Sequence, residues 1–298
     1  MATDTILKLN KLTKTYILGN RKNAKKAQKA IQKLQKKYQH FVNNKDEQSA
    51  KKTEAVLQKA QAYFANEEYE KSYQTITGKH LKKRRRDRGT VVHALNGVDL
   101  EIKKGDLVAV MGPSGSGKST LLNMLGMLDQ PTLGGIFIDN QDVSAIKNRE
   151  LPRIRSKQLG FVFQSFNLIP TLTALENVML PLKYSGIGPR RRREIAKAAL
   201  EQVGLGDRLQ HSPNELSGGQ RQRVAIARSV VTKPSIVLGD ELTGELDSKM
   251  TEEVMRLIAK LNKQGQTFII VTHNPAVAKD CHRIIYMKDG KIEKEVKR

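Results

Sequence analysis

The sequence has little of what stabilises secreted or membrane-embedded proteins. Among its 298 residues there is a single cysteine, Cys281, so no disulfide can form within the chain, and no Cys/His set has zinc-site spacing. This fits a reducing cytoplasm. There is no tryptophan, and apolar runs such as 268–271 are far shorter than the roughly 20 residues of a membrane span. The first residues also lack the apolar stretch of a signal peptide. We therefore expect any membrane role to act through a partner or the protein surface.

Acidic residues are scarce as well. The chain carries 53 lysine and arginine residues against 30 aspartate and glutamate residues, which gives a formal net charge of +23. The excess is concentrated in residues 20–90, which hold 20 of the basic residues and 7 of the acidic ones. A basic surface attracts nucleic acid, the ribosome and the anionic face of a membrane. The charge alone does not choose among them.

Within this basic segment the apolar residues follow helical spacing. From 22 to 41 they recur at steps of three and four, which predicts a helix with one narrow apolar stripe. A turn-rich stretch at 43–46 and a second helical pattern that reaches Ile76 follow. We predict an antiparallel helical hairpin inserted at 20–88. Its two ends return close together, so it need not disturb the domain that carries it.

The remainder of the chain alternates between strand-like and helical patterns. Two of the later strand-like runs, 236–238 and 267–272, are apolar enough to predict fully buried parallel strands. The strand-like segments are 6–9, 98–102, 107–111, 236–238 and 267–272. The later helical segments are 194–203, 221–231 and 252–263. We expect 6–9 to be an edge strand. The alternation predicts an α/β domain with a mainly parallel sheet.

A glycine-rich motif of the form G-x-x-x-x-G-K-[ST] follows the strand at 107–111 and precedes a helical run. Such glycines let backbone N–H groups curl around phosphate oxygens, and the helix N-terminus adds its positive dipole end. Lys118 would hold the β- and γ-phosphates of a nucleotide, and Ser119 a Mg²⁺ ion. The alternative is a glycine-rich turn that binds no nucleotide. The motif consists of Gly112, Pro113, Ser114, Gly115, Ser116, Gly117, Lys118, Ser119 and Thr120.

Two carboxylates, Asp240 and Glu241, end the apolar run that begins near Ile236. Asp240 is placed to support Mg²⁺ through water. Glu241 is placed to accept a proton from an attacking water, as the general base of a hydrolysis. The alternative is an ordinary acidic strand end.

A second phosphate-type turn, Leu216-Ser-Gly-Gly-Gln220, stands at the start of a helical pattern. Here the sequence resembles the ATP-binding-cassette (ABC) ATPases, whose signature motif is LSGGQ and whose two subunits enclose ATP between the P-loop of one and the signature of the other. The resemblance covers 5–19 and about 90–296. It implies that the nucleotide of a second copy is met by Ser217, Gly218, Gly219 and Gln220.

Further motifs follow in the family's order. The resemblance implies that Gln164 is the Q-loop glutamine, near Mg²⁺ and the transmembrane partner, and that His273 is the switch histidine that contacts the γ-phosphate. Glu245-Leu-Asp247 resembles the D-loop. Tyr16 is similar to the aromatic that stacks on adenine, although the insertion separates it from the next strand. Taken alone, Tyr16 fits a packing aromatic and His273 a core histidine.

Three residues depart from the family pattern. Leu242 stands where proline is usual, Glu245 where a small or amide residue is usual, and Asn274 where aspartate is common. The catalytic carboxylate and the histidine are intact. We therefore expect a site that hydrolyses ATP, and leave open how far these departures slow it.

The resemblance implies an ABC nucleotide-binding domain at 1–19 and 89–298, with a P-loop α/β core, an antiparallel β subdomain and a helical subdomain at about 165–231. Two chains would close around two MgATP and drive separate membrane permease subunits from the cytoplasmic face of the membrane. The branch it is similar to contains lipoprotein-release, macrolide-export and cell-division ATPases. The alternative is a non-transport ABC ATPase acting on ribosome or nucleic acid, against which the single cassette counts.

The basic insertion at 20–88 admits three interpretations. It is an arm that contacts the membrane partner or anionic lipid, a contact to ribosome or nucleic acid, or a solvated decoration. Few aromatic residues are interleaved with its lysines and arginines, which counts against nucleic acid.

Overall fold

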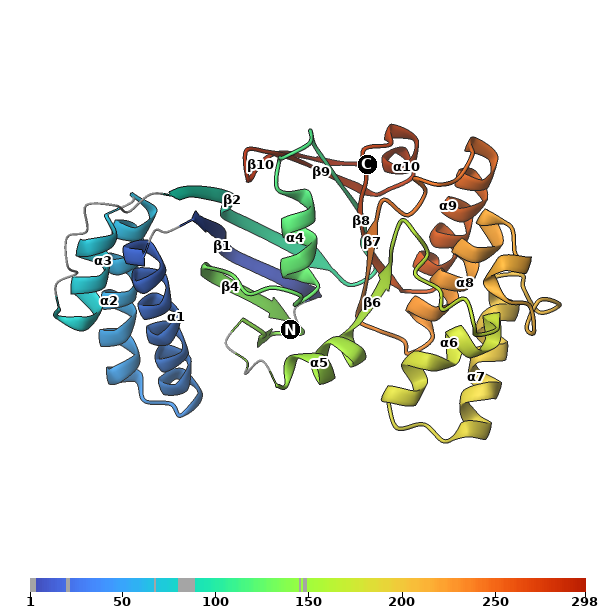
Figure 1. Ribbon diagram of the computed structural model, residues 1–298, viewed down its shortest axis with the longest axis horizontal. Helices are drawn as coiled ribbons and strands as arrows, with labels where there is room; N and C mark the ends of the chain where they lie inside the picture. The colour runs from blue at the N-terminus through green and yellow to red at the C-terminus, as the bar shows by residue number, and fades with distance from the viewer. Residues whose placement is uncertain (1–3, 20–21, 67, 80–88, 145, 147–148) are drawn as a thin grey trace.

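The strands of the chain form two sheets, which the helices cover and extend. The computed structural model describes residues 4–19, 22–66, 68–79, 89–144, 146 and 149–298. In Figure 1 the three N-terminal helices lie at one end of the molecule, beside the antiparallel sheet, and α6, α7 and α8 lie at the opposite end. Residues 80–88 of the predicted insertion lie outside the described residues.

The antiparallel sheet is built on two long strands, β1 (Thr5–Gly19) and β2 (Gly89–Lys103). With β4 (Leu133–Ile138) and β5 (Gln141–Asp142) they give the order β2-β1-β4-β5. Strand β1 is paired on both sides, so the prediction of an edge strand at 6–9 is wrong. The reason is β4, whose sequence LGGIFI has two glycines and so carries a weak strand signal.

The second sheet has the order β10-β9-β3-β8-β7-β6, and all its pairs except β10–β9 are parallel. The prediction of an α/β domain with a mainly parallel sheet is confirmed. The strands are β3 (Leu107–Met111), β6 (Leu159–Val162), β7 (Ile236–Asp240), β8 (Thr267–Val271), β9 (Arg283–Lys288) and β10 (Lys291–Lys297).

Both faces of the parallel sheet are buried, which explains its unbroken apolar runs. Val108 and Val110 of β3 join one core, together with Leu121 of α4 (Lys118–Leu125). Leu107 and Ala109 point to the other face, where α9 (Ser248–Lys263) and α10 (Pro275–Lys279) cover the sheet. The alternation follows from the two-residue period of a strand.

A third core lies among the helices α6 (Ala174–Tyr184), α7 (Pro189–Gln202) and α8 (Gly218–Val230), within the range predicted as a helical subdomain. The 3₁₀ turn η1 (Pro213–Glu215) leads into α8, and α5 (Leu151–Gln158) precedes β6.

The predicted two-helix hairpin has three helices instead: α1 (Lys22–Asn43), α2 (Glu47–Ala65) and α3 (Tyr69–Thr77). Helix α3 folds back on α2, because the ring of Tyr69 packs edge-on against Phe64 at 5.2 Å. The Ser72 hydroxyl also donates to the Ala60 carbonyl at 2.8 Å. The first part of the predicted apolar stripe of α1, Ala24, Ala27, Ile31 and Leu34, packs in one cluster with α2, whereas Phe41 stays partly exposed.

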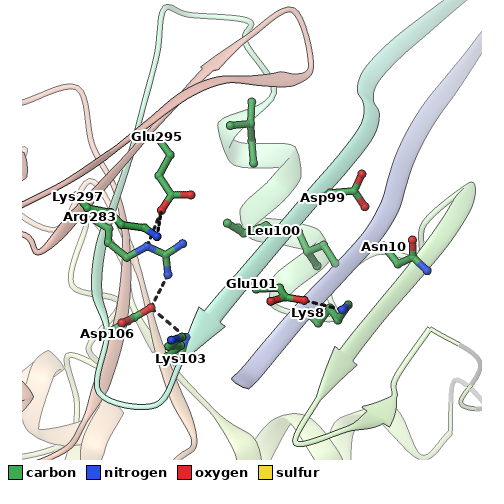
Figure 2. A pocket seen from close by; sticks show the side chains of 12 residues that line it. Lys8, Asn10, Asp99, Leu100, Glu101, Lys103, Asp106, Arg283, Glu295 and Lys297 are labelled. Carbon is green, nitrogen blue, oxygen red and sulfur yellow. Dashed lines mark hydrogen bonds and ion pairs between the residues drawn. The ribbon is translucent and has the colours of Figure 1, made fainter. Parts of the chain in front are cut away.

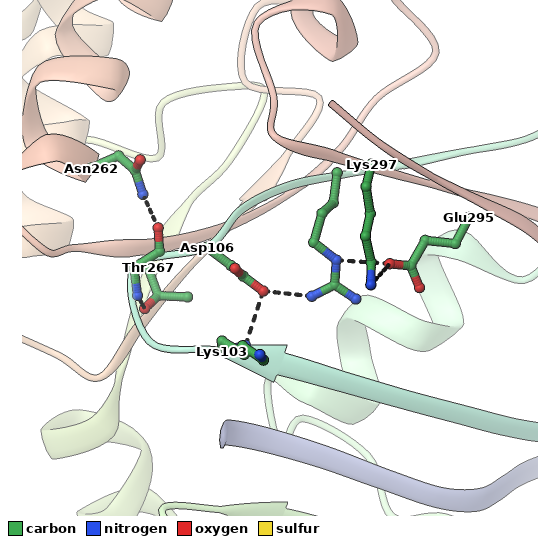
Figure 3. Close-up of polar contacts among 8 residues, drawn as sticks. Lys103, Asp106, Asn262, Thr267, Glu295 and Lys297 are labelled. Atoms are coloured by element: carbon green, nitrogen blue, oxygen red, sulfur yellow. Dashed lines mark hydrogen bonds and ion pairs between the residues drawn. The ribbon is translucent and has the colours of Figure 1, made fainter. Parts of the chain in front are cut away.

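The two sheets are joined by an ion-pair cluster around Arg283 of β9. Its guanidinium binds Asp106, in the turn between β2 and β3, at 2.5 Å and Glu295 of β10 at 2.9 Å (Figure 2). The Asp106 carboxylate also accepts the Lys103 N–H at 2.9 Å (Figure 3). Burial alone would lower the pKa of Arg283, but the hydrogen bonds and charges of the two carboxylates outweigh it and raise the pKa. The cluster borders a cavity of about 800 Å³ between the sheets.

Candidate nucleotide-binding site

Four neighbouring strands each lead into a predicted site residue. In the order β3-β8-β7-β6, the P-loop follows β3, His273 follows β8, Asp240 ends β7 and Gln164 follows β6. Because these strands are parallel, their carboxyl ends meet at one edge of the sheet, which is where ligands bind in open α/β folds. The structure thus brings these predicted residues together.

The P-loop folds tightly against its neighbours. A Cβ at Gly112 would lie 2.2 Å from the Met287 carbonyl oxygen, and one at Gly117 would lie 2.4 Å from the Ala94 carbonyl oxygen, so only glycine fits at either position. Both residues also have positive φ, at 151° and 99°. Glycine is needed here for close backbone approach, as the motif predicts.

Two polar side chains of the loop indicate what it holds. The Lys118 ammonium donates to the carbonyl oxygens of Gly112 at 2.9 Å and Pro113 at 2.8 Å, so it lies across the loop. The Ser116 hydroxyl is buried and has no hydrogen-bond partner within the described part of the chain. A curled backbone, a cation and an unpaired hydroxyl in front of the α4 N-terminus fit a polyphosphate.

Glu241 is held in an uncommon conformation beside His273. Its φ is 44°, in the left-handed region, and its backbone N–H donates to the Val271 carbonyl at 2.9 Å. Its Oε1 lies 2.9 Å from His273 Nδ1, and the histidine ring is 70% exposed. The pair therefore faces outward, toward the mouth of the site.

Asp240 carries an unfavourable charge. Burial raises the pKa of its carboxyl, and the neighbouring charge of Glu241 raises it further. Within the described residues, no group of three His, Cys, Asp or Glu side chains forms a metal cluster. The oxygen donors at this edge are instead Ser119, Gln164 and Asp240, a hard set that suits Mg²⁺ when phosphates complete its shell. A bound divalent cation would also stabilise the ionised carboxylate of Asp240 and so oppose the rise in its pKa.

Gln164 packs against the loop that follows Glu241, since a Cβ at Gly244 would lie 2.9 Å from its Nε2. The next residues, Phe166 and Asn167, both have positive φ, at 58° and 49°. The Arg228 guanidinium of α8 holds them by donating to both carbonyl oxygens, at 2.9 Å and 2.5 Å.

The residues of the signature motif form the start of α8. The Ser217 hydroxyl accepts the Gln220 N–H at 3.3 Å, and the Gln220 side chain accepts the Ser217 N–H at 2.9 Å, which is a capping box. Gly218 and Gly219 form the first turn, where Gly219 faces Met250 of α9. Helix α8 packs with α6, α7, α9 and β6, whereas α4 packs on β2, β7 and β8. Ala225 and Ile226 of α8 also join the core beneath the parallel sheet. In Figure 1, α4 and α8 nevertheless lie apart, so the P-loop and the signature of one chain belong to different, well-separated helices.

Tyr16 lies next to the end of the P-loop. Its hydroxyl donates to Asp129 Oδ2 at 3.3 Å and also hydrogen-bonds Thr120. Lys14 Nζ contacts the same Asp129 oxygen at 2.6 Å and lies 5.0 Å from the Tyr16 ring centre. Burial and the charge of Asp129 raise the pKa of Tyr16, so the phenol stays neutral. These contacts place the ring beside Thr120, the last residue of the P-loop motif, and stacking on adenine stays a prediction.

Sequence reasoning missed Arg228 and Asp129. Arg228 interrupts the apolar pattern of the helix at 221–231, and a cation in such a pattern is the signal that could have found it. Asp129 is 113 residues from Tyr16, and no local pattern marks it. Of the departures from the family pattern, Leu242 is buried and its carbonyl oxygen accepts from Gln222 at 2.5 Å, while Glu245 is exposed. Asn274 caps α10 by accepting the Ala276 N–H.

A family model described as ABC transporter matches residues 95–244. The chain belongs to the ABC transporter family. This ABC protein is 52% identical over 198 residues to an uncharacterized ABC transporter ATP-binding protein, YknY, of Bacillus subtilis; the alignment covers 66% of this chain and 86% of that one. It is 51% identical over 201 residues to the macrolide export ATP-binding/permease protein MacB of Marinobacter nauticus, covering 67% of this chain and 31% of the relative.

Solved structures of ABC cassettes resemble this chain in fold as well as in sequence. The dimeric structure of MJ0796, a bacterial ABC transporter cassette, has a TM-score of 0.64 and 50% sequence identity, over 70% of this chain and 92% of that one. A dimeric post-hydrolysis state of the MJ0796 cassette bound to ADP and Pi gives a TM-score of 0.67, at 38% identity and 98% coverage of both chains.

These findings confirm that this ABC chain is a P-loop ATPase cassette and an ATP-binding subunit of the transporter type. The relatives and structures named here give no support to the alternative of an ATPase acting on ribosome or nucleic acid. Within the described part of the chain, no helix is both long and apolar enough to cross a bilayer.

Proposed function

We propose that two copies of this chain enclose two MgATP, each between the P-loop of one copy and the signature of the other. The observation that carries the proposal is the separation of two preformed phosphate-type helix starts, at α4 and α8, within one chain. Each is a helix start of the kind that binds phosphate, yet α4 and α8 lie apart in Figure 1. The solved dimers of the MJ0796 cassette, one of them bound to ADP and Pi, support a dimer of this chain.

Each residue at the sheet edge then has a defined task. Lys118 exchanges the carbonyl oxygens of Gly112 and Pro113 for phosphate oxygens, and Ser119, Gln164 and Asp240 hold Mg²⁺. Bound Mg²⁺ supplies charge neutralisation at the phosphates.

Hydrolysis itself depends on the partly buried Glu241 and the exposed His273. Glu241 accepts the proton of the attacking water, and His273, 2.9 Å away, orients the carboxylate and reaches toward the γ-phosphate. Tyr16 stacks on adenine, while the partner copy supplies Ser217, Gly218, Gly219 and Gln220 to the phosphates. Catalysis here is mostly positioning.

Complementation between two inactive variants tests the shared site. Lys118→Ala removes the P-loop cation, and Ser217→Arg blocks the signature, so each homodimer should lose nearly all ATPase activity. A mixed dimer contains one composite site in which both elements are intact. Random exchange in an equimolar mixture makes about half of the dimers mixed, and each mixed dimer has one whole site of two, so we expect mixing to restore about a quarter of the wild-type rate. If each site lies within a single chain, mixing restores nothing, and the proposal is wrong.

We further propose that a permease subunit docks in an apolar groove of about 750 Å³ that places the cassette at the cytoplasmic face of the membrane. The groove lies between α5, β6, α6 and α8 and is lined by the exposed side chains of Leu128 and Tyr184, which are 52% and 78% exposed. The stacked rings of Phe161 and Phe163 form part of it. Exposed apolar surface of this kind marks a protein contact.

Two features favour a permease segment as the occupant. Asn167 lines the groove, so whatever docks there touches the loop that follows Gln164. In addition, the chain matches only 31% of a relative whose name joins ATP-binding and permease functions in one chain. Closure of the dimer would thereby move the permease.

Co-purification from detergent extracts tests the groove. We expect Tyr184→Glu to lose the membrane subunit while keeping basal ATPase activity. Val296→Glu is a matched control, because Val296 is also an exposed apolar residue but lies on β10. Loss of the membrane subunit in both variants, or in neither, contradicts docking at this groove.

A further inference from the structure

The basic insertion is fixed to the cassette. On α1, Ala27 and Ile31 are fully buried and pack in one cluster with Leu133 of β4. Two glutamines of the same helix reach the antiparallel sheet. Gln28 donates to the Thr132 hydroxyl at 3.2 Å, and Gln35 donates to the Gly134 carbonyl at 2.7 Å. The direction in which α1 points is therefore set by the sheet.

That direction is toward the side where the permease docks. Gln32 of α1 lines a cavity of about 410 Å³ together with Leu128, Pro152 and Arg155, and these three residues also line the permease groove. In Figure 1 the connection between α1 and α2 points to the same edge of the molecule as α5 and the connection between α6 and α7. This step rests on the proposed function, because the groove defines the membrane side.

The free end of the insertion combines cations with exposed apolar surface. Val42, in the last turn of α1, is 45% exposed, and Phe41 beside it is partly exposed. Six exposed lysines lie along this part of α1, the following turn and the start of α2, and none forms an ion pair with a carboxylate within the described part of the chain. The lysines are Lys33, Lys36, Lys37, Lys45, Lys51 and Lys52. Two carboxylates, Asp46 and Glu47, lie between them, and Asp46 is engaged in capping α2.

We propose that this end of the insertion, through its exposed lysines at 33–52, binds the anionic phospholipid headgroups of the leaflet around the permease. Lysines extend their apolar stems along the protein and place their ammonium groups among phosphates, while an exposed aliphatic residue enters the headgroup boundary. Each lysine near an anionic leaflet strengthens the attraction. An RNA surface would require aromatic rings free to stack on bases. At this end Lys37 Nζ lies over the Phe41 ring, 5.5 Å from its centre, and so covers one face of it.

Vesicle sedimentation of the full chain tests the proposal without any permease. The probes are vesicles of phosphatidylcholine with phosphatidylglycerol, and vesicles of phosphatidylcholine alone. The wild-type protein should bind the anionic vesicles, with lower affinity at high salt, and should not bind the neutral vesicles. The variant Lys33→Glu/Lys36→Glu/Lys37→Glu should bind at least about tenfold more weakly, since each cation near the surface contributes roughly a fivefold factor. Val42→Ser should weaken binding by a few fold.

The control variant, Lys260→Glu/Lys263→Glu/Lys279→Glu, makes the same change in net charge on α9 and α10 and should keep wild-type binding. All variants change exposed residues, and ATPase activity reports their folding. Equal losses in both triple variants would show that only net charge matters, and equal binding to neutral vesicles would exclude headgroup recognition. Either result overturns the proposal.

Other outcomes would assign this end of the insertion to a different partner. If the insertion variant still binds vesicles but no longer co-purifies with the permease, the lysines bind the permease and the proposal is wrong. Tighter binding to RNA than to vesicles would also overturn it. Failure of the groove test with Tyr184→Glu is a separate result, because vesicles contain no permease.

Discussion

Replacing Arg228 with methionine should release the loop that follows Gln164 while leaving α8 folded. The methionine keeps most of the buried stem but removes the two hydrogen bonds to the carbonyl oxygens of Phe166 and Asn167. Hydrogen bonds from a charged donor contribute about 1.5–3 kcal/mol each, so the loop loses about 3 kcal/mol even at the lower limit. Phe166 and Asn167 also have positive φ, an unfavourable backbone conformation that they can leave once the hydrogen bonds are lost.

Amide hydrogen exchange measures this opening directly. At about 1.4 kcal/mol per factor of ten, the loss corresponds to roughly hundredfold faster exchange of residues 165–169. Arg256→Met is the matched control, because that arginine pairs with Glu252 in an exposed ion pair on α9, and it should leave the loop unchanged. Unchanged exchange at 165–169 in the Arg228 variant would refute the reasoning. So would a uniform increase over α8, which would show that the whole helix had loosened.

Two further substitutions probe buried charge. Asp240→Asn should abolish Mg²⁺-dependent hydrolysis yet stabilise the nucleotide-free protein at neutral pH by less than about 1 kcal/mol. Folding raises the pKa of Asp240, so the ionised carboxylate destabilises the folded state above that pKa. As the pH falls and the carboxyl is protonated, this destabilisation disappears. Urea unfolding should therefore show that Asp240→Asn is more stable than wild type at neutral pH but not at acidic pH. Arg283→Met should lower the free energy of unfolding by about 2 kcal/mol, because Asp106 and Glu295 lose their shared cation while partly buried. An effect as small as that of Arg256→Met would contradict it.

Local patterns predicted which of the candidate site residues follow buried strands, because each of these parts has a sequence signal of its own. The P-loop glycines indicate that the backbone approaches its neighbours closely. The apolar run that ends in Asp240 and Glu241 indicates a strand buried on both faces. Parallel pairing then places these ends beside His273. The resemblance to a family supplied Gln164, which has no local signal.

Contacts between distant residues could not be predicted in this way. Arg228 and Asn167 are 61 residues apart, and their contact depends on how α8 packs against β6. The interior position of β1 depends on β4, whose two glycines weaken its strand pattern. The sequence did not predict the third helix of the insertion, because Tyr69, Tyr73 and Ile76 continue the helical spacing of the segment before them. In the structure α2 ends at Ala65 and α3 begins at Tyr69.

The pairing of Gly19 with Gly89 has a consequence for how the chain is made. Strand β1 leaves the ribosome well before β2 and β4, so both of its edges lack partners while the insertion is being synthesised. The helices α1, α2 and α3 form from local contacts, which fold faster than distant strand pairs. Once formed, they shorten the effective loop that β1 and β2 must close. We therefore expect the folded insertion to speed the pairing of β1 with β2 as the chain is synthesised.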